Sequence, residues 1–325
     1  MIIENSKTYN VNEVENLFFR PSFCGKSADE FGIRVLYNMP MPTKIPSFGH
    51  HYNILSTFTS GWQGSTANDY RETEIKMVKL KAENSYSAES YFSTIYEMLT
   101  NSGSVNLGDL TGTDLEKAET ELFRRAIAEG VYGTMWFGDE EGEISDFTSF
   151  RGFIGRMIDL YNSGKCSSIT LFDDRVETSI DAIFNEVWGQ AQDSLRAIAA
   201  DGQLAFFVSS DIYDAYHFWL DGQGLTNVVA EPGNPRPALL YHGIPVVEVP
   251  SHKYNRCRAG SFCILTDRRN LILALNTADS PEKEIRMWYN PDEMENRQRV
   301  VFLAGTAIAD SELVSAYIFD GELDL

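Results

Sequence analysis

The sequence predicts an α+β protein in which a compact α/β segment is inserted between the elements of a more extended domain. Three observations support this prediction: two β-arms around a long polar tip, a strong helix signal in residues 113–137, and a run of strand patterns after residue 240. The strand-rich last third carries few catalytic side chains. Such a pattern is typical of a chain that is built to hold a shape.

The composition is that of a globular protein. The chain has 325 residues, of which 43% are hydrophobic and 23% are charged, so it can bury a large core. Its 47 acidic and 27 basic side chains give a formal net charge of −20, which disfavours nonspecific binding to phosphate over most of the surface. The N-terminus lacks the apolar region of a signal peptide, and no apolar run approaches the ~20 residues of a membrane span. Four cysteines without a short-spaced pair fit reduced thiols, so we expect a soluble cytoplasmic protein without a membrane partner.

Residues 1–30 predict an arm, because they are polar and mixed, with one candidate short helix at 11–19. Residues 31–85 predict an extended hairpin. Its first arm starts with the alternating Ile33 and Val35 and is interrupted by three prolines, the last of them Pro46. A second alternating run follows the long polar tip. Loops of this length usually serve binding or projection.

The tip of the hairpin carries large aromatic side chains that a monomer would have little reason to expose. They are Phe48, Tyr52, Phe58 and Trp62. Large apolar side chains on an extended arm indicate that the arm lies against a partner. We therefore predict inter-subunit contacts at these four residues.

The strongest helix signal begins at Thr113, which can form a Thr-x-x-Glu capping box with Glu116. Its apolar face is predicted at Leu115, Ala118, Leu122 and Ala126, with Phe123 and Ile127 beside it. Gly130 and Gly133 each cost about 1 kcal/mol relative to Ala, so we expect the last turns to bend or fray.

The middle of the chain predicts a compact α/β unit. A second long helix is expected at 178–200, followed by a buried strand at 204–210 and by a third helix that Ser210 could cap. Further strand patterns occur at 244–250, 262–266 and 271–275.

No group of residues satisfies the requirements of a catalytic or metal site. His50 and His51 are adjacent and would point to opposite faces of a strand, so they could not easily share one ion. Cys257 and Cys263 lie near His252, but no motif that activates a thiol surrounds them. The acidic residues 139–146 lack the register of a calcium loop. We predict no catalytic residue, no cofactor and no bound metal.

Several longer stretches carry a resemblance to a known family. They are "MWFGD" (135–139), "AFFVSSDIYDAYHFWL" (205–220), "YHGIPVVEVP" (241–250), "CILTDRRNLILAL" (263–275) and "IRMWYNPDEMENRQRVVFLAGTAIADSELVSAY" (285–317). In this order they resemble the major capsid protein of tailed bacteriophages, which has the Hong Kong 97-like fold. The sequence is most similar to capsid proteins from phages and prophages of Bacteroidetes-type hosts.

The resemblance implies a division of the chain into an N-terminal arm (1–30), an E-loop hairpin (31–85), a peripheral domain (86–170) with a spine helix (113–137), an inserted axial domain (171–284) and a return to the peripheral domain (285–325). It implies no enzymatic activity. It also implies hexamers and pentamers that assemble in the cytoplasm of a bacterial host into the icosahedral capsid of a virion, around double-stranded DNA that is not bound in a sequence-specific way. Further partners would be a portal, a scaffold that is either separate or already removed, and decoration proteins.

Three alternatives remain open at the level of the sequence. A nanocompartment shell of the encapsulin type would have the same fold but hold enzyme cargo. A tail or adaptor component would form rings. A hydrolase would use Cys257 or Cys263 with a histidine.

Overall fold

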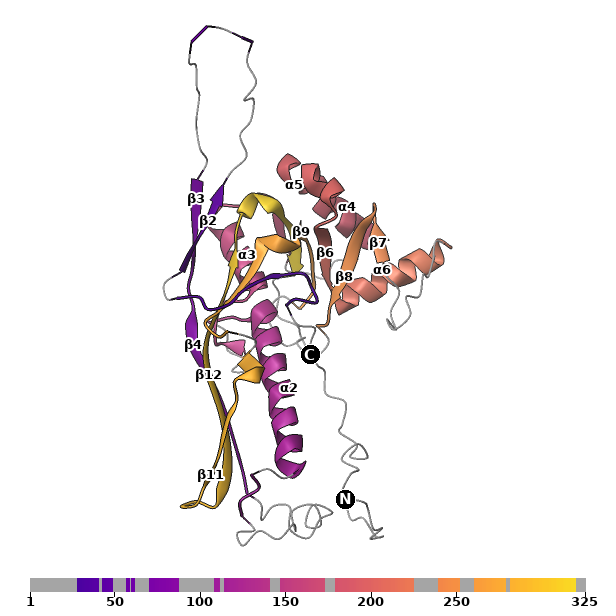
Figure 1. Ribbon diagram of the computed structural model, residues 1–325. Helices are drawn as coiled ribbons and strands as arrows, with labels where there is room; N and C mark the ends of the chain where they lie inside the picture. The colour runs from indigo at the N-terminus through magenta and orange to yellow at the C-terminus, as the bar shows by residue number, and fades with distance from the viewer. Residues whose placement is uncertain are drawn as a thin grey trace.

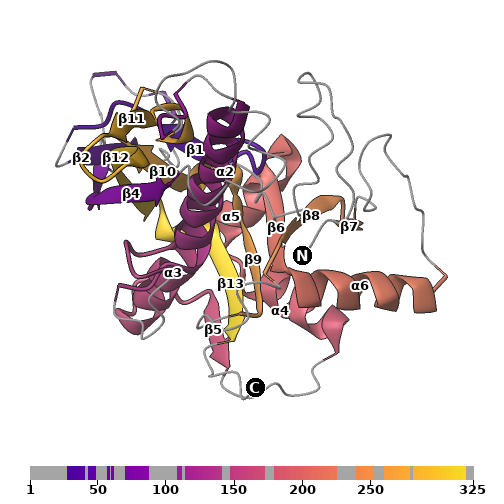
Figure 2. The same cartoon turned by 90° about the horizontal axis from the view of Figure 1, so that it is seen from below.

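The structure is a computed structural model, and it describes residues 28–40, 43–48, 57–58, 60–61, 70–87, 108–111, 114–140, 147–172, 179–224, 239–251, 260–278 and 281–319. Two sheets and one long helix organise these residues, and a separate hairpin projects from one end of the molecule (Figure 1). Figure 2 shows the long helix α2 lying between the two sheets.

The long strand β12 (Glu295–Ile308) is the centre of the five-stranded sheet. It pairs antiparallel with β4 (Val78–Tyr86) along one edge, and with β11 (Arg286–Asn290) and β10 (Leu271–Leu275) along the other. Strand β1 (Arg34–Leu36) adds parallel to β10. The prediction that this N-terminal strand is the first arm of the hairpin is therefore wrong, because it pairs inside the body of the sheet.

The projecting hairpin consists of β2 (Thr43–Phe48) and β3 (Tyr70–Ile75), paired antiparallel from Thr43 opposite Ile75 to Phe48 opposite Tyr70. Pro46 lies inside β2 opposite Glu72, so the prediction that it interrupts the strand is also wrong. Among the described strands β2 has one neighbour, and a proline is tolerated on such an edge because its missing N–H breaks no second ladder.

The six-stranded sheet has the order β5-β13-β9-β6-β8-β7. Its strands are β5 (Ile169–Phe172), β13 (Val314–Phe319), β9 (Phe262–Asp267), β6 (Leu204–Ser209), β8 (Ile244–Val249) and β7 (Leu239–Tyr241). Every residue of β6, β9 and β13 is buried, as expected for inner strands that are covered on both faces. The sheet thus combines strands from the middle of the chain with one strand from its end.

Helix α2 (Asp114–Phe137) confirms the predicted strut, which at the usual rise is about 36 Å long. It continues through both glycines, so the expected fraying of its last turns does not occur. The predicted apolar face is partly wrong. Ala118, Phe123 and Ile127 are buried, whereas Leu122 and Ala126 are exposed, because the contact with the sheets is centred further round the helix. Thr113, the expected cap, lies outside the described residues.

The predicted helix at 178–200 is interrupted. It divides into α4 (Ile180–Gln190), α5 (Asp193–Ala197) and a 3-10 turn (Ile198–Asp201), because Ala191 adopts the extended conformation at φ −57° and ψ 136°. Leu195 beyond the break is fully buried, and Arg196 Nη2 donates to Trp188 O over 2.9 Å across it. The structure confirms the predicted apolar positions of this segment, which are buried, but the prediction of one continuous helix is wrong.

Ser210 is the first residue of α6 (Ser210–Gly222) and not its N-cap, a position held by Ser209, whose side chain makes no capping bond. Its hydroxyl instead donates to Glu248 Oε1 over 2.8 Å and accepts from the Ser251 N–H over 3.0 Å. The Ser251 hydroxyl in turn accepts from the Ser210 N–H over 3.1 Å. These bonds tie the start of α6 to the end of β8.

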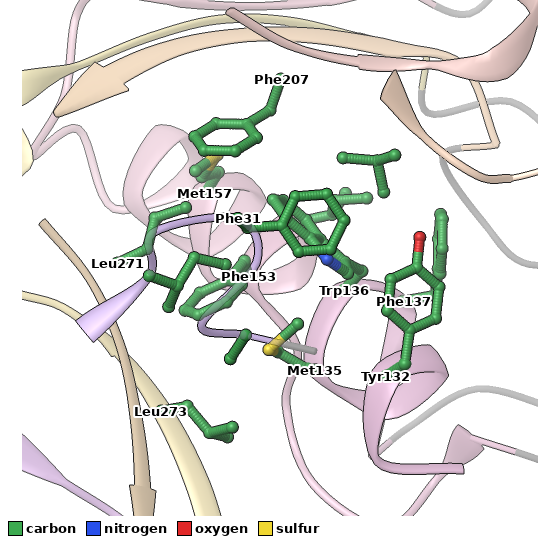
Figure 3. Packing of buried hydrophobic residues seen from close by; sticks show 14 of the residues in the cluster. Phe31, Tyr132, Met135, Trp136, Phe137, Phe153, Met157, Phe207, Leu271 and Leu273 are labelled. Atoms are coloured by element: carbon green, nitrogen blue, oxygen red, sulfur yellow. The ribbon is translucent and has the colours of Figure 1, made fainter. Parts of the chain in front are cut away.

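Helix α3 (Phe153–Asn162) and α2 share the largest hydrophobic cluster with the inner faces of both sheets. Trp136 lies at its centre, with its ring 5.6 Å from Phe31, 5.4 Å from Phe153 and 5.4 Å from Phe207 (Figure 3). Such aromatic pairs add about 0.5–1.5 kcal/mol each beyond the area that they bury.

Alternation along the strands assigns neighbouring residues to different clusters. Phe207 faces α2, while Phe206 and Cys263 face a second cluster under α4 and α6. In the other sheet Leu273 faces α2, while Ile272 faces a third and smaller cluster. Each sheet is therefore covered on both faces over part of its area.

Candidate assembly surfaces

The third cluster attaches the projecting hairpin to the body. Ile45 of β2, Ile75 of β3 and Met77 pack against β10 and β12 at positions that include Ile272 and Ala307. The Thr73 hydroxyl donates to Ala309 O over 3.0 Å. The base of the hairpin is therefore fixed, and its direction relative to the sheet is set by buried contacts.

A glycine in β12 allows the chain between β3 and β4 to approach the sheet closely. A Cβ on Gly305 would lie 2.5 Å from Lys76 O and 3.1 Å from the Cα of Met77. Lys76 also forms a 3.2 Å ion pair with Glu140, which follows the end of α2. The alternating run after residue 70 therefore forms two strands, β3 and β4, and the residues that connect them, Lys76 and Met77, lie close to Gly305 of β12.

The structure places the four predicted contact residues only in part. Phe48 ends β2 opposite Tyr70. Phe58 is described and is 97% exposed, which is the greatest exposure of any large hydrophobic residue in the described chain. Tyr52 and Trp62 lie outside the described residues. Contacts with a second subunit therefore remain a prediction at all four positions.

The far end of the β11–β12 ribbon is a second surface, which the sequence reasoning missed. Met287, Trp288 and Met294 are exposed there by 43%, 39% and 66%. The Arg299 guanidinium lies 5.6 Å from the centre of the Trp288 ring and forms a 2.7 Å ion pair with Glu83. The alternation around Trp288 was the signal that could have indicated this surface.

Strand β4 pairs with β12 of this ribbon, and the ionisable side chains on its two faces have different surroundings. On the outer face a hydrogen bond from Lys81 lowers the pKa of the Glu83 carboxyl, as do the charges of Lys81 and Arg299. On the face toward α2, burial raises the pKa of Tyr86 to about 12, and the nearby carboxylates of Glu116 and Glu119 act in the same direction.

The cysteines described by the structure do not resemble nucleophiles. Cys263 is fully buried in β9, and burial raises the pKa of its thiol far above the ordinary value. Burial also raises the pKa of the Cys166 thiol. Cys257 and His252 of the hydrolase alternative lie outside the described residues, as do His50 and His51.

Other candidate chemistry has structural explanations in the described chain. Asp139, at the start of the acidic run, forms an ion pair with Arg151, which also binds Asp159 at 2.8 Å. The described residues contain no group of three or more His, Cys, Asp or Glu side chains placed to hold a metal ion. Nor is any helix in this part of the chain long and apolar enough to cross a membrane.

Comparison with known sequences finds no match, either among protein-family models or among curated proteins. Comparison with solved structures finds many matches, and they include chains of phage and GTA capsids. The capsid of an empty GTA particle matches with a TM-score of 0.55 at 12% identity, over 94% of this chain and 100% of that chain.

Two further matches extend over nearly the whole chain. The capsid of Myoviridae phage XM1 matches with a TM-score of 0.52 at 10% identity, over 95% of this chain and 97% of that chain. A chain of the satellite phage P4 procapsid, which includes the size determination protein, matches with a TM-score of 0.52 at 10% identity, over 90% of this chain and 94% of that chain. The chain therefore has the α+β fold that its sequence predicted, the Hong Kong 97-like fold of tailed-phage capsids.

Proposed function

We propose that this protein is the major capsid protein of a tailed phage or prophage, with a structural and not an enzymatic role. The observation that carries the proposal is the fold, which matches capsid chains along almost the full length of both partners. The projecting hairpin also supports the proposal. Its base is buried against the body, whereas Phe58 is exposed, and such an arm can cover surface on a neighbouring subunit.

In this proposal the subunits form hexamers and pentamers that close into an icosahedral shell around double-stranded DNA. Obligate interfaces of this kind bury about 2,000 Å² or more. The hairpin of residues 43–75 acts as the E-loop, 113–137 as the spine helix and 171–284 as the axial domain. Phe48, Tyr52, Phe58 and Trp62 supply inter-subunit contacts. The net charge of −20 agrees with a wall that encloses DNA without binding it tightly.

The remaining partners follow from the same proposal. Shells would form in the cytoplasm of the bacterial host with a scaffold and a portal, and with decoration proteins where these exist. The proposal of a Bacteroidetes-type host rests on the sequence resemblance alone.

Deleting the hairpin tip tests the proposal. In this variant residues 49–69 are removed and Phe48 is joined to Tyr70 by a two-residue Asn-Gly turn, so Ile45 and Ile75 keep their buried contacts. A wider deletion that began at residue 41 would remove Ile45 and weaken the body. We expect the subunit to keep its thermal unfolding transition and to form no shells in negative-stain electron microscopy, whereas the intact chain forms closed particles at high concentration.

A matched control replaces residues 49–69 by a Gly/Ser linker of equal length, which keeps the length of the loop while removing Tyr52, Phe58 and Trp62. It should also fail to assemble. Closed particles formed by either variant would contradict the contact role of the tip. If the intact chain stayed monomeric even with co-expressed scaffold, or formed open rings, the shell proposal itself would be wrong. Particles that hold enzyme cargo and no nucleic acid would favour the nanocompartment alternative.

A further inference from the structure

The hairpin of residues 43–75 carries an aromatic side chain that is almost completely uncovered in the described chain. Phe58 is 97% exposed, although the two strands of the hairpin are packed on the body through Ile45 and Ile75. Residues 52–68, which include Phe58, contain no charged side chain, in a chain with a net charge of −20. An uncharged aromatic segment of this kind can enter an apolar site without removing a charge from water.

An apolar groove of about 500 Å³ lies between α2 and β4. Its lining combines apolar side chains of both elements with one from β12, among them Val78, Leu80, Ala82, Phe123, Ile127 and Phe302. The three β4 side chains are only half-buried, so part of their apolar surface has no cover in the described chain. Pockets of this size enclose drug-sized molecules, and the groove can therefore accept an aromatic side chain.

The groove is open on the side of α2. Ala126 is exposed, and Gly130 lies one turn further along the same face of the helix. A Cβ added to Gly130 would meet no atom within 4 Å. The outward face of a surface helix is normally charged or polar. Here two small, uncharged residues line the groove instead, so a side chain from outside can enter it without displacing its walls.

The geometry of one subunit separates Phe58 from its own groove. Strand β3 leads from the far end of the hairpin to its base, and β4 continues from that base past the groove, so the two strands extend in opposite directions (Figure 1). Tyr70 and Leu80 are ten residues apart along these strands, which corresponds to ~34 Å. A phenyl ring carried beyond Phe48 and Tyr70 is therefore placed to meet the groove of another copy.

We propose that Phe58 of one subunit inserts into the groove between α2 and β4 of a second copy of this chain. The inference rests on the proposed assembly role of the hairpin and adds the surface that receives it. Protein interfaces concentrate their binding energy in aromatic side chains that fill pockets of this kind. Because Phe58 and the groove are different parts of the chain, each subunit can donate one phenyl ring and accept another. Such a heterologous contact repeats from copy to copy and can close into a ring of subunits.

Two variants of the full chain test the contact by sedimentation velocity. Phe58→Ala removes the phenyl ring, and Gly130→Trp fills the groove. We expect each to raise the concentration of half-maximal association about tenfold to a hundredfold, as loss of one buried aromatic side chain predicts. The matched control Gly130→Ala leaves most of the groove open and should associate like the intact chain. An unchanged thermal unfolding transition shows that each variant is folded.

A mixture of the two variants separates this contact from a contact between two hairpins. Phe58→Ala keeps an intact groove and Gly130→Trp keeps an intact phenyl ring, so an equimolar mixture can form one complete contact per pair. It should contain heterodimers at a concentration at which each variant alone is monomeric. A mixture that stays monomeric there would overturn the proposal, because hairpins that pair with one another cannot be rescued in this way.

Photocrosslinking leaves the groove unchanged and is independent of both variants. With p-benzoylphenylalanine in place of Phe58, we expect crosslinks to residues 78–82 or 123–134 of an isotopically labelled second copy. Crosslinks within one chain, or to another region of the second copy, would contradict the contact. Closed particles with crosslinks elsewhere would do so while leaving the shell proposal intact. Crosslinks to the groove within open rings would support the contact and contradict the shell.

Discussion

At the scale of single residues, Tyr86 shows how the sheet and the helix act on one group. Its hydroxyl accepts a hydrogen bond from Gln298 Nε2 at 3.4 Å, and Glu116 and Glu119 of α2 are close enough to disfavour its ionised form. Burial is the largest cause of the raised pKa, which lies at about 12. The phenol therefore stays neutral in the folded chain at pH values where a free tyrosine ionises.

This shift predicts a loss of stability at high pH. Because the folded chain holds the Tyr86 proton up to about pH 12 and the unfolded chain releases it near pH 10, the contribution is fully present below pH 10 and falls between pH 10 and 12. Tyr86→Phe removes this contribution, so its unfolding free energy should decline less steeply over that range. Urea denaturation at pH 8, 9, 10 and 11, taken as a difference between the two proteins, measures the effect. Equal slopes would show that the Tyr86 environment is not as described.

At the scale of elements, the junction of α2 and α3 depends on close approach of the backbone. The Gly152 N–H donates to Gly138 O over 2.8 Å, and a Cβ on Gly138 would lie 2.1 Å from Phe150 O and 2.5 Å from Thr134 O. Any side chain at Gly138 must therefore displace backbone rather than a flexible group. Arg151, which binds the carboxylates of Asp139 and Asp159, holds the two helices in this arrangement.

We expect Gly138→Ala to destabilise the chain by about 1–3 kcal/mol, the usual range for overpacking of a well-packed site. The matched control is Gly130→Ala in the same helix, where a Cβ meets no neighbour within 4 Å. There the change should stabilise by about 0.5–1 kcal/mol, because alanine loses less backbone entropy than glycine. Denaturant midpoints at constant m-value give both numbers. A Gly138→Ala variant as stable as Gly130→Ala would refute the tight junction.

At the scale of the whole molecule, the net charge of −20 opposes the association that the proposed function requires. Salt should relieve this repulsion, since the Debye length falls from about 30 Å at 0.01 M to about 10 Å at 0.1 M ionic strength. We expect the assembled fraction of the purified subunit, measured by light scattering, to rise over this range. Assembly that weakened with added salt would indicate that attractive ion pairs between subunits outweigh the net repulsion.

The sequence predicted those elements whose pattern is local. Helix α2 and the buried strands β6, β9 and β10 followed from periodicity, since neighbours in the chain determine such patterns. Pairing was less predictable. Nothing close to Val35 in the chain indicates that its strand joins β10, and Pro46 breaks a strand only if the strand has neighbours on both edges.

The candidate surfaces were predictable only where the sequence itself is unusual. The aromatic residues of the hairpin were visible as unusual composition, and Phe58 is indeed exposed. The exposure of Leu122 and Ala126 on α2 was not predictable, because both residues match the helical period as well as the buried Phe123 and Ile127 do. The packing of the two sheets decides which of these sets is covered, and that packing is a property of the whole fold.

The position of β13 in the six-stranded sheet has a consequence for synthesis of the protein. This strand lies between β5 and β9, and β5 has no other partner among the described strands. A nascent chain on the ribosome carries β5 long before residues 314–319 emerge, so the sheet cannot close until those residues have been synthesised. Prematurely terminated chains would lack an inner strand and expose unpaired strand edges.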